Sequence, residues 1–372
     1  MNDPWTIPSP VASAALRYPD APAIVADDTH SWSEVRRLVA LRAGALASQG
    51  VRPGAVVALA APRDPSWIID AHAIGWLGAV LAPVNAQLPA VAAVAALGQL
   101  RPDFHIVRGE LRLESGLIGR RLADDKSAKS APERPWPLDE DRALLLTSGT
   151  TGAPKPVLLR TGQLLLSAFG SAIALGHLPG DRWLHCLPLH HVGGLALLYR
   201  GALYGTALEL APCFDAVHVA RRMLSGAING VSLTPRMLSD VLAVDAGRPL
   251  PAALRVILVG GAAMPAALLQ TARDLDLPVA RTWGMTEAAS QVCTTTPGDL
   301  NGSGLPPLTF ARVTAAGAGL VVDGPLVQGA LVTADEGLID AQGRVTVLGR
   351  GDDVIVSGGT KTMPGVIEAV LR

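Results

Sequence analysis

Leu144-Leu-Leu-Thr-Ser-Gly-Thr-Thr-Gly-Ala-Pro-Lys155 is the stretch that decides the fold of this 372-residue chain. Its apolar beginning predicts the end of a buried strand, after which the backbone turns through hydroxyls and glycines to a lysine. Glycines let a backbone approach an anion closely, hydroxyls donate hydrogen bonds, and a lysine adds a mobile positive charge. These groups indicate a loop that grips a triphosphate. A solvated Ser/Thr/Gly loop is the plainer alternative.

Two common phosphate-binding patterns are absent from the sequence. A Walker A loop requires Gly-Lys-Ser/Thr after a longer glycine gap, and no such run occurs. No G-x-G-x-x-G follows a predicted strand either. The phosphate loop therefore belongs to another class.

The segment Thr-Ser-Gly-Thr-Thr-Gly-x-Pro-Lys at 147–155 resembles the phosphate loop of the acyl-adenylate-forming superfamily. This superfamily contains acyl- and aryl-CoA ligases, adenylation domains and luciferases. Further segments resemble its motifs in the same order: Pro-Leu-His-His-Val-Gly-Gly at 188–194, Thr-Trp-Gly-Met-Thr-Glu at 282–287, Thr-Ala-Asp at 333–335, and Gly-Arg-Gly-Asp-Asp-Val-Ile-Val-Ser-Gly-Gly at 349–359. An ordered series is far more specific than one motif.

Composition agrees with an enzyme of this kind. Hydrophobic residues make up 49% of the chain, enough for a sizeable core, and the formal net charge of −1 without a basic block argues against nucleic acid or an anionic membrane as partner. The cysteines Cys186, Cys213 and Cys293 are scattered and form no CxxC pair, which suits a reducing cytosol. The most apolar span, 71–84, is too short to cross a bilayer. We expect a cytoplasmic protein, and a homodimer is one state left open.

The order of predicted elements indicates an α/β fold. Helical periodicity or helix signals cover 33–49, 66–77, 161–175 and 265–274, and short apolar runs predict strands at 56–60, 79–83 and 255–259. A polar stretch at 119–142 predicts a surface connection, and short strands with glycine turns follow residue 299.

The resemblance implies the large N-terminal domain of the adenylate-forming fold over 1–349. We expect two α/β lobes at about 1–130 and 140–298, and a small β-barrel-like unit at 299–349. Residues 350–372 match the hinge, with Asp352 as the hinge residue, and the start of a C-terminal domain that is largely absent. Family members carry a catalytic lysine in that domain, and Lys361 does not match it. We therefore expect this chain alone to be impaired.

The resemblance also assigns roles to individual residues. The catalytic group is Lys155, Thr286, Glu287 and His191. Glu287 and Thr151 would hold Mg²⁺. The nucleotide would be bound by Thr147, Ser148, Gly149, Thr150, Thr151, Gly152, Gly260, Gly261, Ala262, Trp283, Gly284, Asp335 and Arg350. The acid would be bound by His191, Arg200, Gly261, Gly284 and Ser290.

The chemistry of the superfamily explains these residue types. A carboxylate attacks the α-phosphorus of ATP to give an acyl-adenylate and pyrophosphate, and the thiol of CoA then displaces AMP. Both nucleophiles are substrates, so the protein contributes positioning and charge neutralisation. Glu287 would coordinate Mg²⁺, Thr286 would donate to the α-phosphate, and Asp335 and Arg350 would contact the ribose.

Three positions depart from the family pattern. Pro156 replaces the glycine after the loop lysine, which stiffens the backbone and removes a donor. Trp283 replaces tyrosine and can still stack on adenine. Ala334 replaces the glycine before Asp335, a mild change unless that backbone needs a positive φ.

Other polar residues have competing interpretations. His185, Cys186, His190 and His191 could suggest a metal, but no second ligand cluster follows, and His191 is either a pocket residue or a buried core histidine. The Gly-Gly-Ala-Ala run at 260–263 is either a pocket floor near adenine or a plain strand-to-helix turn.

Within the superfamily the resemblance is closest to the o-succinylbenzoate–CoA ligases of menaquinone biosynthesis. Arg200 follows His191 by nine positions, where those ligases place an arginine facing the acid, and the segments at 231–235 and 282–293 resemble theirs. An arginine can pair bidentately with the carboxylate that does not react. An interlobe salt bridge is the alternative role for Arg200.

The sequence leaves three hypotheses for function. The first is o-succinylbenzoate–CoA ligase. The second is a ligase or adenylation enzyme for another acid in secondary metabolism. The third is an adenylate-binding subunit that needs a separate C-terminal partner.

Overall fold

The structure is a computed structural model that describes residues 5–108, 119–125, 127–147, 154–244, 248–302, 304–317, 319–351, 355–357 and 360–362. The chain divides into two compact units: Met1–Leu165 with Leu178–Cys213, and Leu166–His177 with Phe214–Arg372. This division does not follow the predicted lobe boundaries, which stay a prediction.

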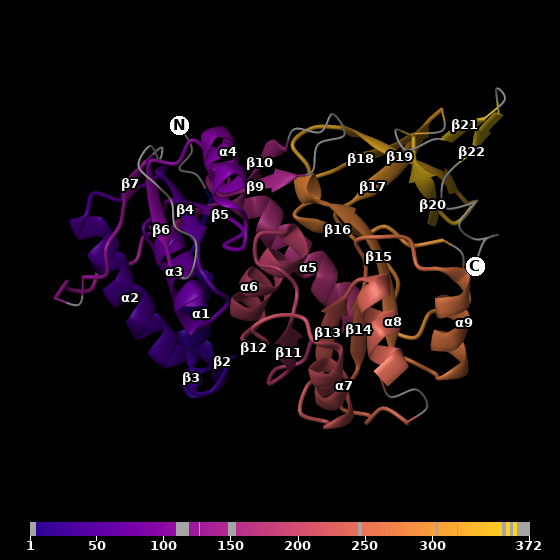
Figure 1. Cartoon of the computed structure of the whole chain (residues 1–372), viewed down its shortest axis with the longest axis horizontal. Coiled ribbons are helices and arrows are strands. Elements are labelled where there is room, and N and C mark those ends of the chain that lie inside the picture. Colours follow the sequence, from indigo (N-terminus) through magenta and orange to yellow (C-terminus); the bar gives the residue numbers. More distant parts are fainter. Residues whose placement is uncertain are drawn as a thin grey trace. The chain divides into compact units, whose positions relative to one another are not determined.

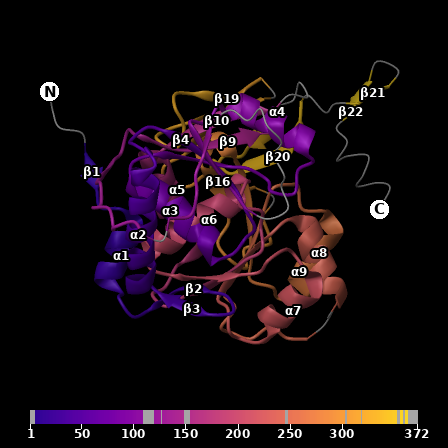
Figure 2. The same ribbon diagram turned by 60° about the vertical axis from the view of Figure 1, so that its left-hand side comes forward.

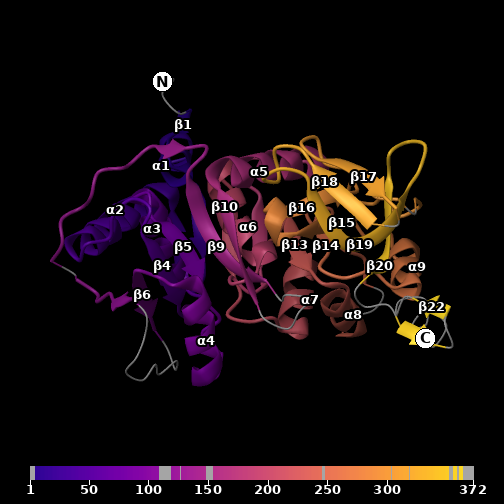
Figure 3. The ribbon, with the colours of Figure 1, turned by 90° about the horizontal axis from the view of Figure 1, so that it is seen from above.

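A six-stranded sheet forms the centre of the first unit. Its strand order is β10 (Lys155–Arg160), β9 (Asp141–Thr147), β5 (Val80–Pro83), β4 (Val56–Ala60), β6 (Phe104–Val107) and β7 (Arg120–Arg121), with β10 antiparallel to its neighbour and the others parallel. The connections through α3 (Pro65–Trp76) and α4 (Ala90–Leu100) run in opposite directions along the sheet. Right-handed crossovers therefore place these helices on opposite faces. Figure 3 shows α2 (Trp32–Ser48) beside α3, with α4 apart from both.

Local signals explain why these helices begin where they do. The Ser31 hydroxyl accepts from the backbone N–H of Glu34 at the start of α2, the spacing of a capping box. Asp64 caps α3 by accepting from the N–H of Trp67, and Pro65 occupies the first turn. The predictions of helices at 33–49 and 66–77 and of strands at 56–60 and 79–83 are confirmed to within two residues.

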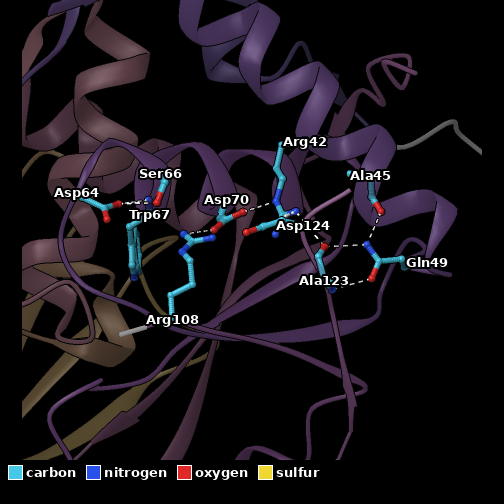
Figure 4. A network of polar contacts seen from close by, with 10 residues as sticks. All are labelled: Arg42, Ala45, Gln49, Asp64, Ser66, Trp67, Asp70, Arg108, Ala123 and Asp124. Carbon is cyan, nitrogen blue, oxygen red and sulfur yellow. Dashed lines mark hydrogen bonds and ion pairs between the residues drawn. The ribbon is translucent and has the colours of Figure 1, made fainter. Parts of the chain in front are cut away.

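A buried carboxylate ties the helices of the first unit to the sheet. Asp70 of α3 lies between two arginines (Figure 4): its Oδ1 is 2.5 Å from Nε of Arg42, and its other oxygen pairs with Arg108 after β6. Arg42 also pairs with Asp124 at 3.1 Å. Asp70 is 1% exposed, so two partners offset the cost of burying its charge.

The remaining strands of the first unit form a second parallel layer. Their order is β11 (Arg182–His185), β12 (Ala207–Leu210), β2 (Pro22–Val25) and β3 (Thr29–Ser31), with only β3 antiparallel. Helices α1 (Pro10–Arg17) and α6 (Val192–Tyr204) pack on each other, and β1 (Thr6–Ile7) pairs with β8 (Trp136–Pro137).

The prediction that 119–142 is a surface connection is wrong for the last part of this segment, around residues 136–142. Trp136 is buried, and Arg142 is 0% exposed with its guanidinium carbon 4.5 Å from the Trp136 ring centroid. A hydrogen bond to Thr161 Oγ1 (3.1 Å) and an ion pair with Glu140 (3.2 Å) satisfy part of that guanidinium. The polar composition misled because the cation–π contact lets an arginine enter the core.

The second unit contains four neighbouring parallel and antiparallel strands, and the helices that connect them lie on one face. The strand order is β16 (Ser290–Thr294), β15 (Val279–Met285), β14 (Val256–Val259) and β13 (Gly230–Leu233). The connections through α8 (Pro235–Val244) and α9 (Ala266–Asp274) run the same way, so right-handed crossovers put both on one face. Figure 2 shows them together with α7 (Ala216–Leu224). The helix at 265–274 and the strand at 255–259 are confirmed.

An antiparallel four-stranded sheet completes the second unit (Figure 1). Its strands are β17 (Arg312–Ala316), β18 (Gly319–Asp323), β19 (Leu331–Ile339) and β20 (Val345–Arg350), and a hairpin of β21 (Ile355–Ser357) and β22 (Thr360–Thr362) follows. Helix α5 (Thr161–Leu175), which matches its predicted bounds, begins in the first unit and ends in the second.

The core confirms the buried strand at the head of the phosphate loop. Leu144 and Leu146 pack against the cluster that includes Ala58, Ala82 and Leu97, whereas Leu145 is 1% exposed. Adjacent side chains on a strand point to opposite faces, so this sheet is covered on both sides. None of the helices in the described ranges has both the length and the apolar character that a bilayer crossing requires.

Candidate active site

The phosphate loop connects two antiparallel strands. Thr147 is the last residue of β9 and Lys155 the first of β10; the two are register partners, and the Thr147 hydroxyl donates to the Lys155 carbonyl at 3.3 Å. The Lys155 side chain is exposed. The predicted phosphate ligands Ser148, Gly149, Thr150, Thr151 and Gly152, and the predicted hinge residue Asp352, lie outside the described residues.

The strand after the lysine was not predicted, and it explains Pro156. That proline lies in β10, which is an edge strand of the six-stranded sheet. Proline lacks a backbone donor and is therefore tolerated at a sheet edge. Pro156 thus belongs to a strand rather than to the loop.

The predicted adenine and ribose residues are joined directly. Trp283 of β15 donates from Nε1 to Oδ2 of Asp335 in β19 at 3.0 Å, although 52 positions separate them. Both side chains are half-buried. The hydrogen bond fixes the carboxylate with one oxygen, leaving its other lone pairs able to accept ribose hydroxyls. Tryptophan at this position therefore adds a donor and keeps an aromatic face.

Arg350 lies across the sheet from the same carboxylate. It is the register partner of Asp335, so opposite charges meet on neighbouring strands β19 and β20. The hydroxyl of Thr333 accepts from the Asp335 N–H at 3.2 Å and donates to the Leu320 carbonyl at 2.8 Å. Ala334 is not among the residues with positive φ, so its replacement of glycine causes no strain. The condition under which that departure would matter, a positive φ, is therefore not met.

A tight turn carries Thr286 and Glu287. They open a 3₁₀ turn, η1 (Thr286–Ala288), between β15 and β16, and both are half-buried. The turn ends in two non-glycine residues with positive φ, Ala289 at 53° and Ser290 at 116°. Gly284 is required beside it, because a Cβ there would overlap the Ser290 carbonyl. The predicted substrate positions Gly284 and Ser290 therefore touch through their backbones.

The glycine run after β14 approaches the same strand. A Cβ at Gly260 would lie 2.5 Å from Cγ2 of Thr282, so only glycine permits this approach. Gly261 has φ of 83°, and both Gly261 and Ala262 are exposed. Exposed backbone beside Trp283 and Gly284 agrees with a pocket floor, and a plain turn does not require the close approach.

Three histidines near the start of α6 belong to the first unit. His185 is 0% exposed and its Nε2 lies 2.9 Å from the Gly194 carbonyl. Burial lowers the pKa of His185 to about 4, with the nearby Arg63 charge acting in the same direction. Burial, followed by the charges of His191 and Arg63, lowers the pKa of His190 to about 4 as well. These imidazoles are neutral at pH 7 and available as hydrogen-bonding groups.

His191 is exposed and occupies the N-cap position of α6 without a capping hydrogen bond. Its pKa is also lowered by partial burial. The alternative of a satisfied core histidine is therefore wrong for His191, and the buried histidine of this segment is His185. Arg63, which sequence reasoning missed, donates to the carbonyls of His185 (3.3 Å) and Ala211 (2.7 Å) and so links the ends of β11 and β12.

Arg200 is a buried cation with unused donors. It lies in α6, is 4% exposed, and its Nε and Nη2 have no hydrogen-bond partner among the described residues. Burial lowers its pKa. The described part of the chain gives it no carboxylate partner, which removes support from a salt-bridge role. His191 and Arg200 lie about 13 Å apart along the helix axis and two and a half turns apart, so they leave α6 in different directions.

The predicted site residues fall into two sets. Thr147, Lys155, His191 and Arg200 belong to the first unit. Gly260, Gly261, Ala262, Trp283, Gly284, Thr286, Glu287, Ser290, Asp335 and Arg350 belong to the second unit, where the contacts above link most of them. The sequence analysis did not predict that the Thr333 hydroxyl accepts from the Asp335 N–H, although the Thr-x-Asp spacing is typical of such a bond.

Glu287 suits an ion that arrives with a nucleotide. Within the described ranges no group of three or more His, Cys, Asp or Glu side chains is placed to hold a metal. Mg²⁺ in nucleotide sites needs only one or two protein carboxylates, since phosphates and waters complete its shell. A half-buried Glu287 within this short turn fits that requirement.

A family model for AMP-binding enzymes matches residues 11–338. The chain belongs to this family. It is 30% identical to the 2-succinylbenzoate–CoA ligase of Bacillus mycoides (strain KBAB4) over 398 residues, covering 98% of this chain and 83% of that relative.

Solved structures of the same kind of enzyme agree with the fold. The o-succinylbenzoate CoA synthetase (MenE) from Bacillus subtilis in complex with the acyl-adenylate intermediate OSB-AMP superposes with a TM-score of 0.90 at 27% identity, covering 99% of this chain and 83% of that one. The same enzyme in complex with ATP and magnesium ion gives a TM-score of 0.88 at 26% identity, covering 99% and 84%. The α/β fold of the large adenylate-forming domain is thereby confirmed.

Proposed function

We propose that this protein is an AMP-forming acid–CoA ligase that activates o-succinylbenzoate in menaquinone biosynthesis. Its substrates are ATP, the acid and CoA, with Mg²⁺ bound alongside ATP. The observation that carries the proposal is the Trp283–Asp335–Arg350 arrangement, which offers an aromatic face, a fixed carboxylate and a cation to one nucleoside. The similarity to 2-succinylbenzoate–CoA ligases supports the choice of acid and of reaction.

Different residues are proposed to bind different parts of ATP during the first half-reaction, the formation of the acyl-adenylate. Asp335 accepts from the ribose hydroxyls, and Trp283 holds that carboxylate while its ring covers adenine. Thr286 donates to the α-phosphate, and Lys155 with the loop at 148–152 binds the outer phosphates. Mg²⁺ held at Glu287 and Thr151 would neutralise phosphate charge. Positioning of this kind lowers the barrier without a protein nucleophile.

Arg200 is the proposed receptor for the second carboxylate of the acid. Its Nε and Nη2, which have no hydrogen-bond partner among the described residues, can donate to the two oxygens of a carboxylate in a bidentate pair. A buried guanidinium without a partner is costly, and a dicarboxylate substrate supplies the missing charge. His191, neutral at the start of α6, and separately Gly261, Gly284 and Ser290 are proposed to contact the acid at positions other than the carboxylate that Arg200 binds.

A panel of acids tests the assignment. The complete gene product is mixed with MgATP and CoA, and pyrophosphate release is followed for o-succinylbenzoate, benzoate, and aryl and fatty acids. We expect o-succinylbenzoate to give the highest kcat/KM by at least tenfold. A faster benzoate or fatty acid would overturn the substrate, and no release with any acid would overturn the ligase proposal.

Two further assignments complete the proposal. Scattered free cysteines and the biosynthetic role favour the cytoplasm, which fractionation would test. Light scattering during size-exclusion chromatography would measure whether the protein forms the homodimer that the sequence leaves open. We propose no nucleic-acid or membrane partner, since the net charge is −1 and the sequence has no basic block.

A further inference from the structure

A serine outside the nucleotide motifs contacts the turn that carries Glu287. Ser167, in α5, is 2% exposed and donates from Oγ to the Ala289 carbonyl at 2.9 Å. A serine inside a helix ordinarily bonds the carbonyl four residues back or faces solvent. This one instead reaches a residue 122 positions later in the sequence.

The turn that receives this bond is strained. Ala289 at φ 53° and Ser290 at φ 116° both lie in regions that side chains disfavour. Consecutive residues of this kind persist only where the surroundings fix them, and such strain concentrates at functional sites. Backbone contacts hold part of this turn: the Ala289 N–H donates to the Thr286 carbonyl at 2.9 Å, Ser290 is the register partner of Met285, and Gly284 makes room for Ser290.

We infer that Ser167 is a positioning residue that holds the strained turn and thereby aims Glu287 at the magnesium of bound ATP. The inference rests on the proposed function. Without the hydroxyl, the buried Ala289 carbonyl loses its side-chain donor, and the backbone can relax toward negative φ. Relaxation at Ala289 changes the direction of Glu287 two residues before it. Trp283 and Asp335, which hold the nucleoside, are fixed separately by their own hydrogen bond.

The same helix offers a matched control. Ser171 lies one turn further along α5, is 0% exposed, and its Oγ has no hydrogen-bond partner among the described residues. Ser171→Ala therefore removes a buried hydroxyl from the same helix without removing a hydrogen bond. Ala289→Gly supplies the opposite change, because glycine adopts positive φ without strain and does not need the serine to hold it there.

Calorimetry with two ligands separates positioning from stability. We expect Ser167→Ala to raise the Kd for MgATP about tenfold and to leave the Kd for AMP within about twofold, since AMP needs no magnesium. Ser171→Ala should leave both constants unchanged. Adding Ala289→Gly to Ser167→Ala should restore the MgATP Kd to within about threefold of the wild type.

Each of the other outcomes overturns either the positioning role of Ser167 or the proposed function. Equal MgATP binding by wild type and Ser167→Ala, equal loss for MgATP and AMP, or no rescue by Ala289→Gly overturns the positioning role alone. No MgATP binding by the wild type overturns the proposed function together with this inference. If Ser167→Ala fails to fold, Ser167→Cys replaces it, because a thiol keeps the size with a weaker donor. The Cys variant should weaken MgATP by a few-fold and spare AMP, and an unchanged MgATP Kd would overturn the role.

Discussion

The proposed nucleotide site and the proposed acid site of this protein are built in different ways. In the second unit, Trp283, Asp335 and Arg350 are linked by a hydrogen bond and a strand register, and the turn at 286–290 is fixed by backbone contacts. In the first unit, Arg200 stands buried with unused donors. The nucleotide is common to a whole family, and the groups proposed to bind it are held in place by hydrogen bonds and by strand register. The acid varies, and a single side chain that needs a partner can specify it.

The largest expected effect comes from Gly284→Ala. A Cβ at this position would overlap the Ser290 carbonyl, so the turn carrying Glu287 cannot keep its shape. We expect more than about a hundredfold loss of MgATP affinity by calorimetry, or loss of the folded state by thermal melting. Gly98→Ala is the control, since open space surrounds Gly98 and alanine favours its helix. Unchanged binding in Gly284→Ala would contradict the backbone account.

Arg200→Leu should have the next largest effect, and only on the acid. We expect an o-succinylbenzoyl-adenylate analogue to bind roughly a hundredfold more weakly, whereas AMP and benzoate change little. Because two guanidinium donors have no partner in the described part of the chain, the melting temperature should stay the same or rise. Equal losses for o-succinylbenzoate and benzoate, or a lower melting temperature, would indicate a structural arginine.

Trp283→Phe tests the preorganised carboxylate on a smaller scale. The change keeps an aromatic face and removes the donor to Asp335. The net contribution of such a hydrogen bond is about 0.5–1.5 kcal/mol, so the Kd for AMP should rise about two- to tenfold. Trp283→Tyr, with the aromatic residue usual in the family, should bind AMP more tightly than Trp283→Phe. Wild-type affinity for AMP in Trp283→Phe would show that the Trp283–Asp335 hydrogen bond does not contribute to binding.

The stability of the fold should also depend on pH, and the change should be gradual. The folded-state pKa values of His185 and His190 are lowered to about 4 by burial, below the ordinary 6.5. The unfolded chain therefore takes up protons first as the pH falls. The free energy of unfolding from urea titrations should be constant above pH 6.5 and decrease between pH 6.5 and 4. His185→Gln should flatten that decrease, and an unchanged slope would exclude His185 as a contributor.

Sequence reasoning recovered what depends on local pattern. Apolar periodicity and capping signals predicted α2, α3, α5, α9 and the strands between them, and ordered motifs selected Trp283, Glu287 and Asp335. It missed what depends on distant partners. Arg142 looks like a surface residue until Trp136 covers it, and Ser167 has no local signal because its acceptor lies 122 residues away. The strand β10 was not predicted because it begins with Lys155 and Pro156, and a proline fits a strand only at a sheet edge, which the sequence does not reveal.

A double-mutant cycle on the o-succinylbenzoyl-adenylate analogue tests the central claim most directly. Calorimetry is run on the wild type, Arg200→Leu, Trp283→Phe and the double variant. The account predicts tight binding by the wild type and single losses that add in the double variant to within about 0.5 kcal/mol, because the two regions hold separate parts of the ligand. Absence of binding by the wild type, or a double variant no weaker than Arg200→Leu alone, would contradict it.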